Sequence, residues 1–244
     1  FFNIILFNYV VQNWQQNLVP ASAANIANAK SFLAGVTGTG GSRLDLGLAQ
    51  ALLQFDDADY SNAILAFTDG KSPIDPEALA ASNSYQTGIF PIGIGDNIDR
   101  YRLEMTATLN YGFATYLDEE DNLREEILDV FEIVNQPILK NVDLVFNKPD
   151  VHDIMPQVYP TTYVGSYFCV VGRYEVGEPS VMNLVGEGVY GTTQYDYQLD
   201  FTDSTNVNKF SEKLWAKEMI DALEQKILIY GETAALKDSV IALS

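Results

Sequence analysis

The chain has 244 residues, with 33 acidic and 14 basic side chains and a formal net charge of −19. Such a charge excludes binding to nucleic acid or anionic membranes, because that binding depends on Lys and Arg neutralising phosphate groups. The hydrophobic fraction of 47% is enough for one large domain or two ordinary ones. No apolar run approaches the ~20 residues of a membrane helix. Composition therefore predicts a globular protein with no membrane span and no nucleic-acid partner.

The first 136 residues alternate apolar runs with amphipathic stretches, which is typical of βαβ units around a parallel sheet. Strands are expected at 2–7, 63–67, 88–94 and 113–117, and helices at 22–33, 43–55, 100–109 and 122–134. A further helix begins at Asp75-Pro76-Glu77, where Asp is an N-cap and Pro the first helical residue. The predicted fold class is α/β, a Rossmann-like parallel sheet flanked by helices. The run from Phe1 looks like the interior of a strand, so we expect a longer or processed protein.

The sequence pattern changes after Pro137. Short alternating runs at 142–146, 167–174, 180–185 and 195–201 predict antiparallel β-structure with C-terminal helices at 209–229 and 233–242. The first of these helices carries an apolar stripe that we interpret as core packing: Phe210, Leu214, Trp215, Met219, Leu223 and Ile227. The predicted parts are a domain at 1–136, a β-sandwich-like domain at 137–208, and a helical segment at 209–244 that packs on the β domain.

One cysteine and one histidine limit the possible chemistry. Cys169 cannot form an internal disulfide or a Cys-based zinc site, and its apolar neighbours predict a buried small hydrophobe. We interpret His152 as a residue of an exposed loop, although a His-based triad would have to use it. No catalytic residue is predicted.

Polar residues gather at the predicted carboxyl edge of the sheet, where open α/β sheets bind ligands. A buried strand ends at Asp69, and Ser42 opens the helix at 43–55 with a hydroxyl directed to the same edge. Both have simpler alternative roles, Ser42 as a helix N-cap and Asp69 as a turn residue. Asp45, Lys71 and Ser72 lie on the same rim, either as contacts for a partner or as solvated loop residues.

Three other motifs do not support a cofactor site. Residues 35–42 have P-loop spacing, but Gly41 replaces the phosphate-binding lysine. Residues 93–98 lack the third glycine of a dinucleotide site. We interpret the acidic run at 118–121 as a solvated turn before a helix rather than a loose Ca²⁺ site.

The order of several motifs resembles a known family. The runs at 2–8, 40–42, 67–70 and 90–95 resemble a von Willebrand factor type A domain. Those at 135–139, 171–174 and 214–217 are similar to the inter-alpha-trypsin-inhibitor heavy chains, in which a VIT domain precedes the A domain. The resemblance spans nearly the whole chain.

The resemblance implies a divalent cation, usually Mg²⁺ with Ca²⁺ as the other option, at the carboxyl edge of the sheet. The family holds it with an Asp-x-Ser-x-Ser motif, a Thr and an Asp. Ser42 stands where the Thr is expected, and Asp69 where the Asp is expected. No Asp-x-Ser-x-Ser occurs in the 244 residues, and we expect it, with the VIT domain, before Phe1. Our hypothesis is that this chain alone binds Mg²⁺ negligibly.

The function implied is a non-enzymatic adhesion or protein-binding module in a secreted or cell-surface protein. Its partner would be a protein or an extracellular-matrix ligand. One alternative is a structural scaffold subunit of a larger extracellular assembly, with a vestigial metal site. The other is a carboxylate-based hydrolase, which the many acidic residues allow but which no spacing supports, because none singles out a catalytic pair of acids.

Overall fold

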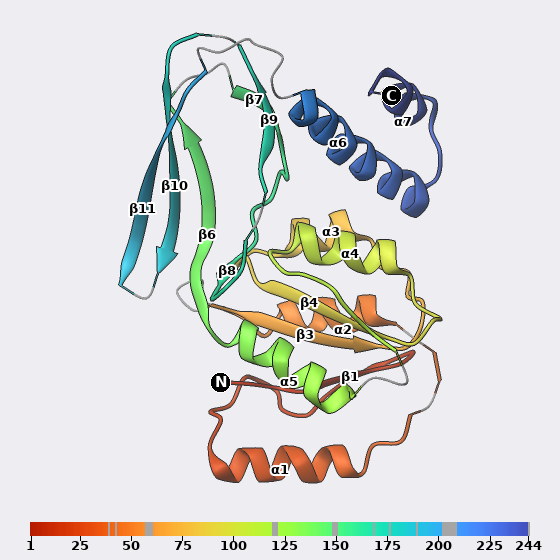
Figure 1. Cartoon of the computed structure of the whole chain (residues 1–244). Coiled ribbons are helices and arrows are strands. Elements are labelled where there is room, and N and C mark those ends of the chain that lie inside the picture. The colour runs from red at the N-terminus through yellow and green to blue at the C-terminus, as the bar shows by residue number, and fades with distance from the viewer. Residues whose placement is uncertain are drawn as a thin grey trace. The chain divides into compact units, whose positions relative to one another are not determined.

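The computed structural model describes residues 1–38, 40–41, 43–56, 61–118, 122–147, 151–167, 169–175, 177–188, 190–201 and 209–243. The chain divides into two compact units, Phe1–Glu126 and Ile127–Ser244, whose elements are drawn in Figure 1. The boundary falls inside helix α5 (Leu123–Val134). The division into parts at 136 and 208 stays a prediction.

The first unit contains a three-stranded parallel sheet in the order β3-β4-β5. Its strands are β3 (Ala63–Thr68), β4 (Gly88–Ile94) and β5 (Thr115–Leu117). All of β4 except its last residue is buried, as expected for a central strand covered on both faces. Because the strands are parallel, their carboxyl ends, including the end of β3 before Asp69, lie at one edge of the sheet.

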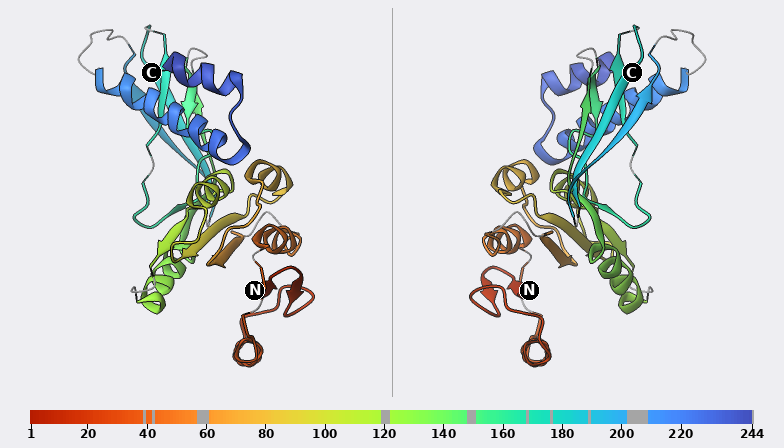
Figure 2. Two further views of the ribbon diagram at one scale, coloured as in Figure 1. Left: turned by 90° about the vertical axis from the view of Figure 1, so that its right-hand side faces the viewer. Right: turned by 90° about the vertical axis from the view of Figure 1, so that its left-hand side faces the viewer.

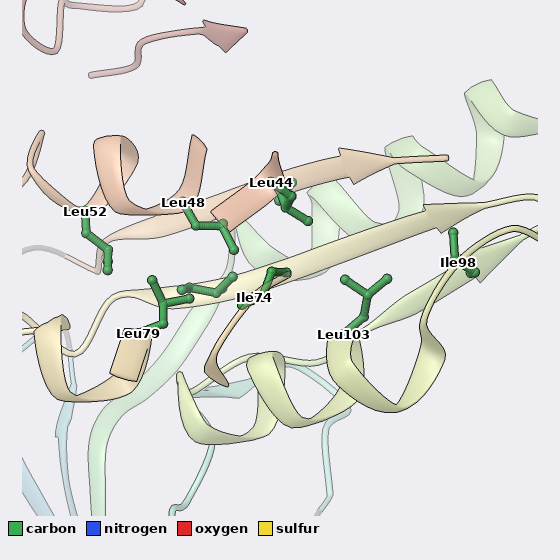
Figure 3. Packing of buried hydrophobic residues seen from close by; sticks show 9 residues of the cluster. Leu44, Leu48, Leu52, Ile74, Leu79, Ile98 and Leu103 are labelled. Carbon is green, nitrogen blue, oxygen red and sulfur yellow. The ribbon is translucent and has the colours of Figure 1, made fainter. Parts of the chain in front are cut away.

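Three helices of this unit form its core with the sheet: α2 (Leu44–Leu52), α3 (Pro76–Ser82) and α4 (Arg100–Leu109). The predicted start of α3 is confirmed, since the Asp75 carboxylate accepts a hydrogen bond of 3.1 Å from the Ala78 N–H. Apolar side chains from the helices and adjoining loops gather against β3 and β4, and those labelled in Figure 3 are Leu44, Leu48, Leu52, Ile74, Leu79, Ile98 and Leu103.

The N-terminal run is a hairpin, not the single strand predicted at 2–7. Strand β1 (Ile5–Phe7) pairs antiparallel with β2 (Val11–Asn13). The prediction missed β2 because Val-Gln-Asn is too short and too polar to show strand alternation.

Helix α1 (Ala23–Ala34) follows the hairpin and begins at Ser22, whose Oγ accepts from the Asn25 N–H at 3.2 Å. The prediction that Ile26, Ala29, Phe32 and Leu33 share one face implied burial, but only Ala29 is buried. Ile26 is 40% exposed and Leu33 46% exposed. In both views of Figure 2, α1 stands apart from the sheet, so helical periodicity identified the apolar face but nothing in the described part of the chain covers it fully.

The second unit is antiparallel β-structure followed by helices. One sheet has the order β11-β10-β6-β8, with β6 (Pro137–Phe146), β8 (Thr162–Tyr163), β10 (Ser180–Gly188) and β11 (Gly191–Leu199). A second sheet pairs β7 (Val151–Met155) with β9 (Val171–Tyr174). The predicted fold class, a parallel sheet with helices followed by antiparallel strands and C-terminal helices, is confirmed.

Two predictions for single residues are wrong. Cys169 is exposed, because the apolar run around it enters a strand only at Val171. His152 lies in strand β7 rather than in a loop, although its side chain is 47% exposed as expected. For His152, the two-stranded sheet of β7 and β9 offers too little area to bury the side chain.

Helices α6 (Lys209–Tyr230) and α7 (Ala234–Leu243) end the described chain. The Trp215 indole N–H donates to the Asp153 carbonyl at 2.8 Å, which holds α6 against β7. The interpretation of the α6 stripe as core is wrong for Phe210, which is 74% exposed, whereas the other five members are partly buried. None of the helices described in this structure has the length and apolar character needed to cross a membrane.

Candidate functional site

The candidate site begins with the turn after β3. The Thr68 hydroxyl donates to the Gly70 carbonyl at 3.1 Å and accepts from the Gly70 N–H at 3.3 Å. These bonds close a tight turn around Asp69. Thr68 is buried whereas Asp69 and Lys71 are exposed, so the turn presents one carboxylate and one ammonium group to solvent at the carboxyl edge of the sheet.

Ser72 joins this turn to the start of α2. Its side chain is buried, and its Oγ accepts a hydrogen bond of 3.3 Å from the Asp45 N–H. The same hydroxyl donates to Asp45 Oδ1 at 3.3 Å. The loop that contains Asp69 is therefore fixed against the first turn of α2, 27 residues earlier in the sequence. Ser42 lies outside the described residues, but its neighbour Arg43 is part of this arrangement.

The Arg43 guanidinium donates two hydrogen bonds to the Asp45 carboxylate. Its Nε lies 2.8 Å from Asp45 Oδ1, and its Nη2 lies 2.6 Å from Oδ2. The hydrogen bonds from Arg43 are the main cause that lowers the pKa of the Asp45 carboxyl below its usual range, and the Ser72 hydroxyl adds to it. Asp45 is thus a fixed, ionised residue whose two oxygens already have donors. Sequence reasoning missed this role of Arg43, whose only signal is the Arg-Leu-Asp order at a helix start.

The glycines before α2 have a packing role. Gly40 has a φ of +88°, in the region that favours glycine. A Cβ at Gly41 would lie 2.6 Å from the ring of Tyr9, which comes from the turn between β1 and β2. The Gly-Gly pair therefore lets the loop pass close to an aromatic ring. The positive φ of Gly40 and the close approach of Gly41 to Tyr9 are both compatible with a loop that binds no phosphate.

The described residues alone do not fit a Mg²⁺ ion. No group of three or more His, Cys, Asp or Glu side chains that could hold a metal occurs in the described parts of the chain. Beside the turn after β3 they offer the exposed Asp69 carboxylate and the Asp45 carboxylate, which Arg43 already binds. Mg²⁺ requires six oxygens in near-octahedral order, so further ligands would have to come from elsewhere.

Solved structures with the same arrangement identify the fold. A von Willebrand factor type A protein from Catenulispora acidiphila matches with a TM-score of 0.66, covering 99% of this chain and 72% of that chain at 15% identity. The fold is that of a von Willebrand factor type A protein. The ArnB paralog VWA2 from Sulfolobus acidocaldarius also matches, with a TM-score of 0.52 and 14% identity, covering 99% of this chain and 68% of that chain.

Sequence comparison adds a second resemblance to this type A fold. Human inter-alpha-trypsin inhibitor heavy chain H4 is 24% identical over 272 residues, which cover 100% of this chain and 29% of that protein. Heavy chain H3 of Rattus norvegicus is 27% identical over 247 residues, covering 95% of this chain and 26% of that protein. The resemblance to heavy chains is confirmed, and the chain spans less than a third of these curated relatives. No protein-family model matches the sequence.

Proposed function

We propose that this protein is a non-enzymatic module that binds a protein or extracellular-matrix ligand through the carboxyl edge of the β3-β4-β5 sheet. The binding depends on a divalent cation, Mg²⁺ or Ca²⁺, that bridges the edge to an acidic side chain of the partner. A secreted or cell-surface location fits such a role. The likeness to heavy chains and to a type A fold supports this class of function.

The observation that carries the proposal is the pair of hydrogen bonds between Asp45 and Ser72. They fix the turn containing Asp69 beside the first turn of α2, which directly follows Ser42 and Arg43 in the sequence. In the proposal, the Asp69 carboxylate and the Ser42 hydroxyl are two metal ligands. The other ligands lie in residues outside this sequence, because a hydroxyl and one carboxylate have too little charge to dehydrate Mg²⁺.

The rim residues have separate roles in the proposal. Asp45 positions the loop through Ser72, and Arg43 occupies its oxygens, so Asp45 is not a metal ligand. Lys71 is exposed next to Asp69 and makes a charged contact with an acidic partner.

Titration calorimetry with Mg²⁺ tests the incomplete site. We expect no sub-millimolar binding to residues 1–244, and sub-millimolar binding to a longer form of the protein that includes the missing ligands. In that longer form, Asp69→Ala should abolish the binding and leave the melting temperature within a few degrees, because Asp69 is exposed. Asp56→Ala, an exposed acid just beyond the far end of α2, is the matched control and should bind normally.

Three results would contradict the proposal. Tight Mg²⁺ binding to residues 1–244 alone would show that no ligands are missing. Global unfolding of the Asp69→Ala variant would make Asp69 a structural residue. Partner binding that is indifferent to EDTA would favour the scaffold alternative with a vestigial metal site.

A further inference from the structure

Strand β11 (Gly191–Leu199) forms an unprotected edge of the four-stranded sheet. It is the outermost strand in the order β11-β10-β6-β8, as Figure 1 shows, and no described strand pairs with its outer side. Seven of its nine residues are exposed, and only Thr193 and Leu199 are partly buried. Its ladder with β10 has no bulge, from the pair of Ser180 and Leu199 at one end to the pair of Gly188 and Gly191 at the other. β11 is therefore a long, regular strand with a free row of backbone donors and acceptors.

Natural edge strands usually carry devices that prevent pairing with another chain, such as lysine, proline or a bulge. The sequence Gly-Thr-Thr-Gln-Tyr-Asp-Tyr-Gln-Leu of β11 contains neither Lys nor Pro, and Asp196 is its single charged residue. The one bulge nearby, between Val185 and Glu187, lies on the other side of β10, where β10 meets β6. In a chain with a net charge of −19, β11 is an almost uncharged strip.

The two faces of β11 differ in character. Tyr195 and Tyr197 are each 47% exposed and lie opposite Leu184 and Met182 of β10. The apolar face of the sheet thus continues to the open edge. On the other face, the Asp196 Oδ1 accepts hydrogen bonds of 2.7 Å from the side-chain amides of Asn183 and Gln194.

We propose that β11 is a homodimer interface at which the β11 strands of two copies pair antiparallel about a two-fold axis at Tyr195. Residue 195 is the midpoint of 191–199, so this register pairs all nine residues of each strand. Tyr195 then lies opposite Tyr195 of the second copy, which favours an aromatic cross-strand pair. The Gln194 amide lies opposite the Asp196 carboxylate of the second copy. A register centred on Asp196 would instead place two carboxylates opposite each other.

A second copy fits this edge better than an unrelated peptide because the strand is complementary to itself. A two-fold contact uses the same patch twice, and here amide meets carboxylate and aromatic meets aromatic. The small charge of β11 also favours a second copy of this chain as the partner. Two strongly acidic chains can approach most closely where each carries least charge.

Sedimentation velocity across micromolar concentrations tests the pairing. We expect the unmodified protein to dimerise, and Tyr195→Lys and Tyr195→Glu each to raise the dissociation constant at least about tenfold, because like charges then lie opposite each other. An equimolar mixture of the Lys and Glu variants should dimerise again, since opposite charges then meet. Tyr190→Lys is the matched control: Tyr190 is fully exposed in the turn before β11, outside the paired register, and its variant should dimerise normally.

Circular dichroism would confirm that each variant is folded, and the mixture experiment succeeds only if both are. A protein that stays monomeric at every concentration would overturn the proposal. Dimerisation of either single variant as strong as that of the unmodified protein would overturn it too. A mixture that stays monomeric would overturn the register centred on Tyr195.

Discussion

Gly112 lies where the chain has no room for a side chain. A Cβ at this position would come within 1.9 Å of the Ile89 carbonyl oxygen and 2.7 Å of its carbon. Both atoms belong to the backbone of β4, which cannot move aside without breaking the parallel sheet. We predict that Gly112→Ala lowers the free energy of unfolding by at least about 2 kcal/mol, measured by urea denaturation.

The matched control for this prediction is Gly38→Ala. A Cβ at Gly38 would meet no atom within 4 Å. The Gly38→Ala variant should therefore have a free energy of unfolding within about 0.5 kcal/mol of that of the unmodified protein. Equal free energies of unfolding for the two variants would mean that the loop at Gly112 moves away easily and that the Ile89 backbone does not exclude a side chain there.

At the same scale, the sequence predicts part of the candidate site. The place of Asp69 at the end of β3 follows from an apolar run that stops at a turn, and β3 and the turn are present. The two hydrogen bonds from Arg43 to Asp45 could not be predicted, because they depend on the non-helical backbone at Arg43, with φ −113° and ψ 58°. The metal-ligand roles of Ser42 and Asp69 stay predictions.

Helix α6 illustrates how one side chain can dock an element. The Trp215 indole N–H bonds the Asp153 carbonyl, and the Arg173 guanidinium lies 5.3 Å from the centre of the Trp215 ring. We predict that Trp215→Phe lowers the free energy of unfolding by about 1 kcal/mol, since it leaves the carbonyl without this donor while retaining an aromatic ring. Chemical denaturation followed by circular dichroism would measure the loss.

Phe210→Ala provides the comparison within the same helix. Phe210 is 74% exposed, so its truncation should change stability by less than half as much. Equal losses for the two variants would argue that α6 is held by general apolar contact and not by the Trp215 hydrogen bond.

The elements with strong patterns were predictable and the short polar ones were not. The expected ranges 88–94 and 100–109 coincide with β4 and α4, because β4 is an unbroken apolar run and α4 begins after an Asp99 N-cap. Strands β2, β7 and β8 were missed, since two to five residues with polar members show no alternation. The exposed face of α1 was missed for a different reason. Periodicity tells which residues share a face but not what covers that face.

The net charge of the whole molecule opposes the association of two copies. Two copies with a charge of −19 repel each other, and salt screens this repulsion over a distance of about 8 Å at physiological ionic strength. We therefore predict that dimerisation through β11 becomes stronger as sodium chloride is raised from low to physiological concentration, measured by sedimentation. Weaker association at higher salt would instead point to a contact made by ion pairs.

The exposure of Cys169 has a practical consequence for following the protein in solution. The sequence contains no other cysteine, so a maleimide dye would attach at one known position shortly before β9 without any engineered substitution. Energy transfer between donor-labelled and acceptor-labelled samples would then report subunit exchange in real time. The native thiol thus serves as a single labelling site for fluorescence measurements.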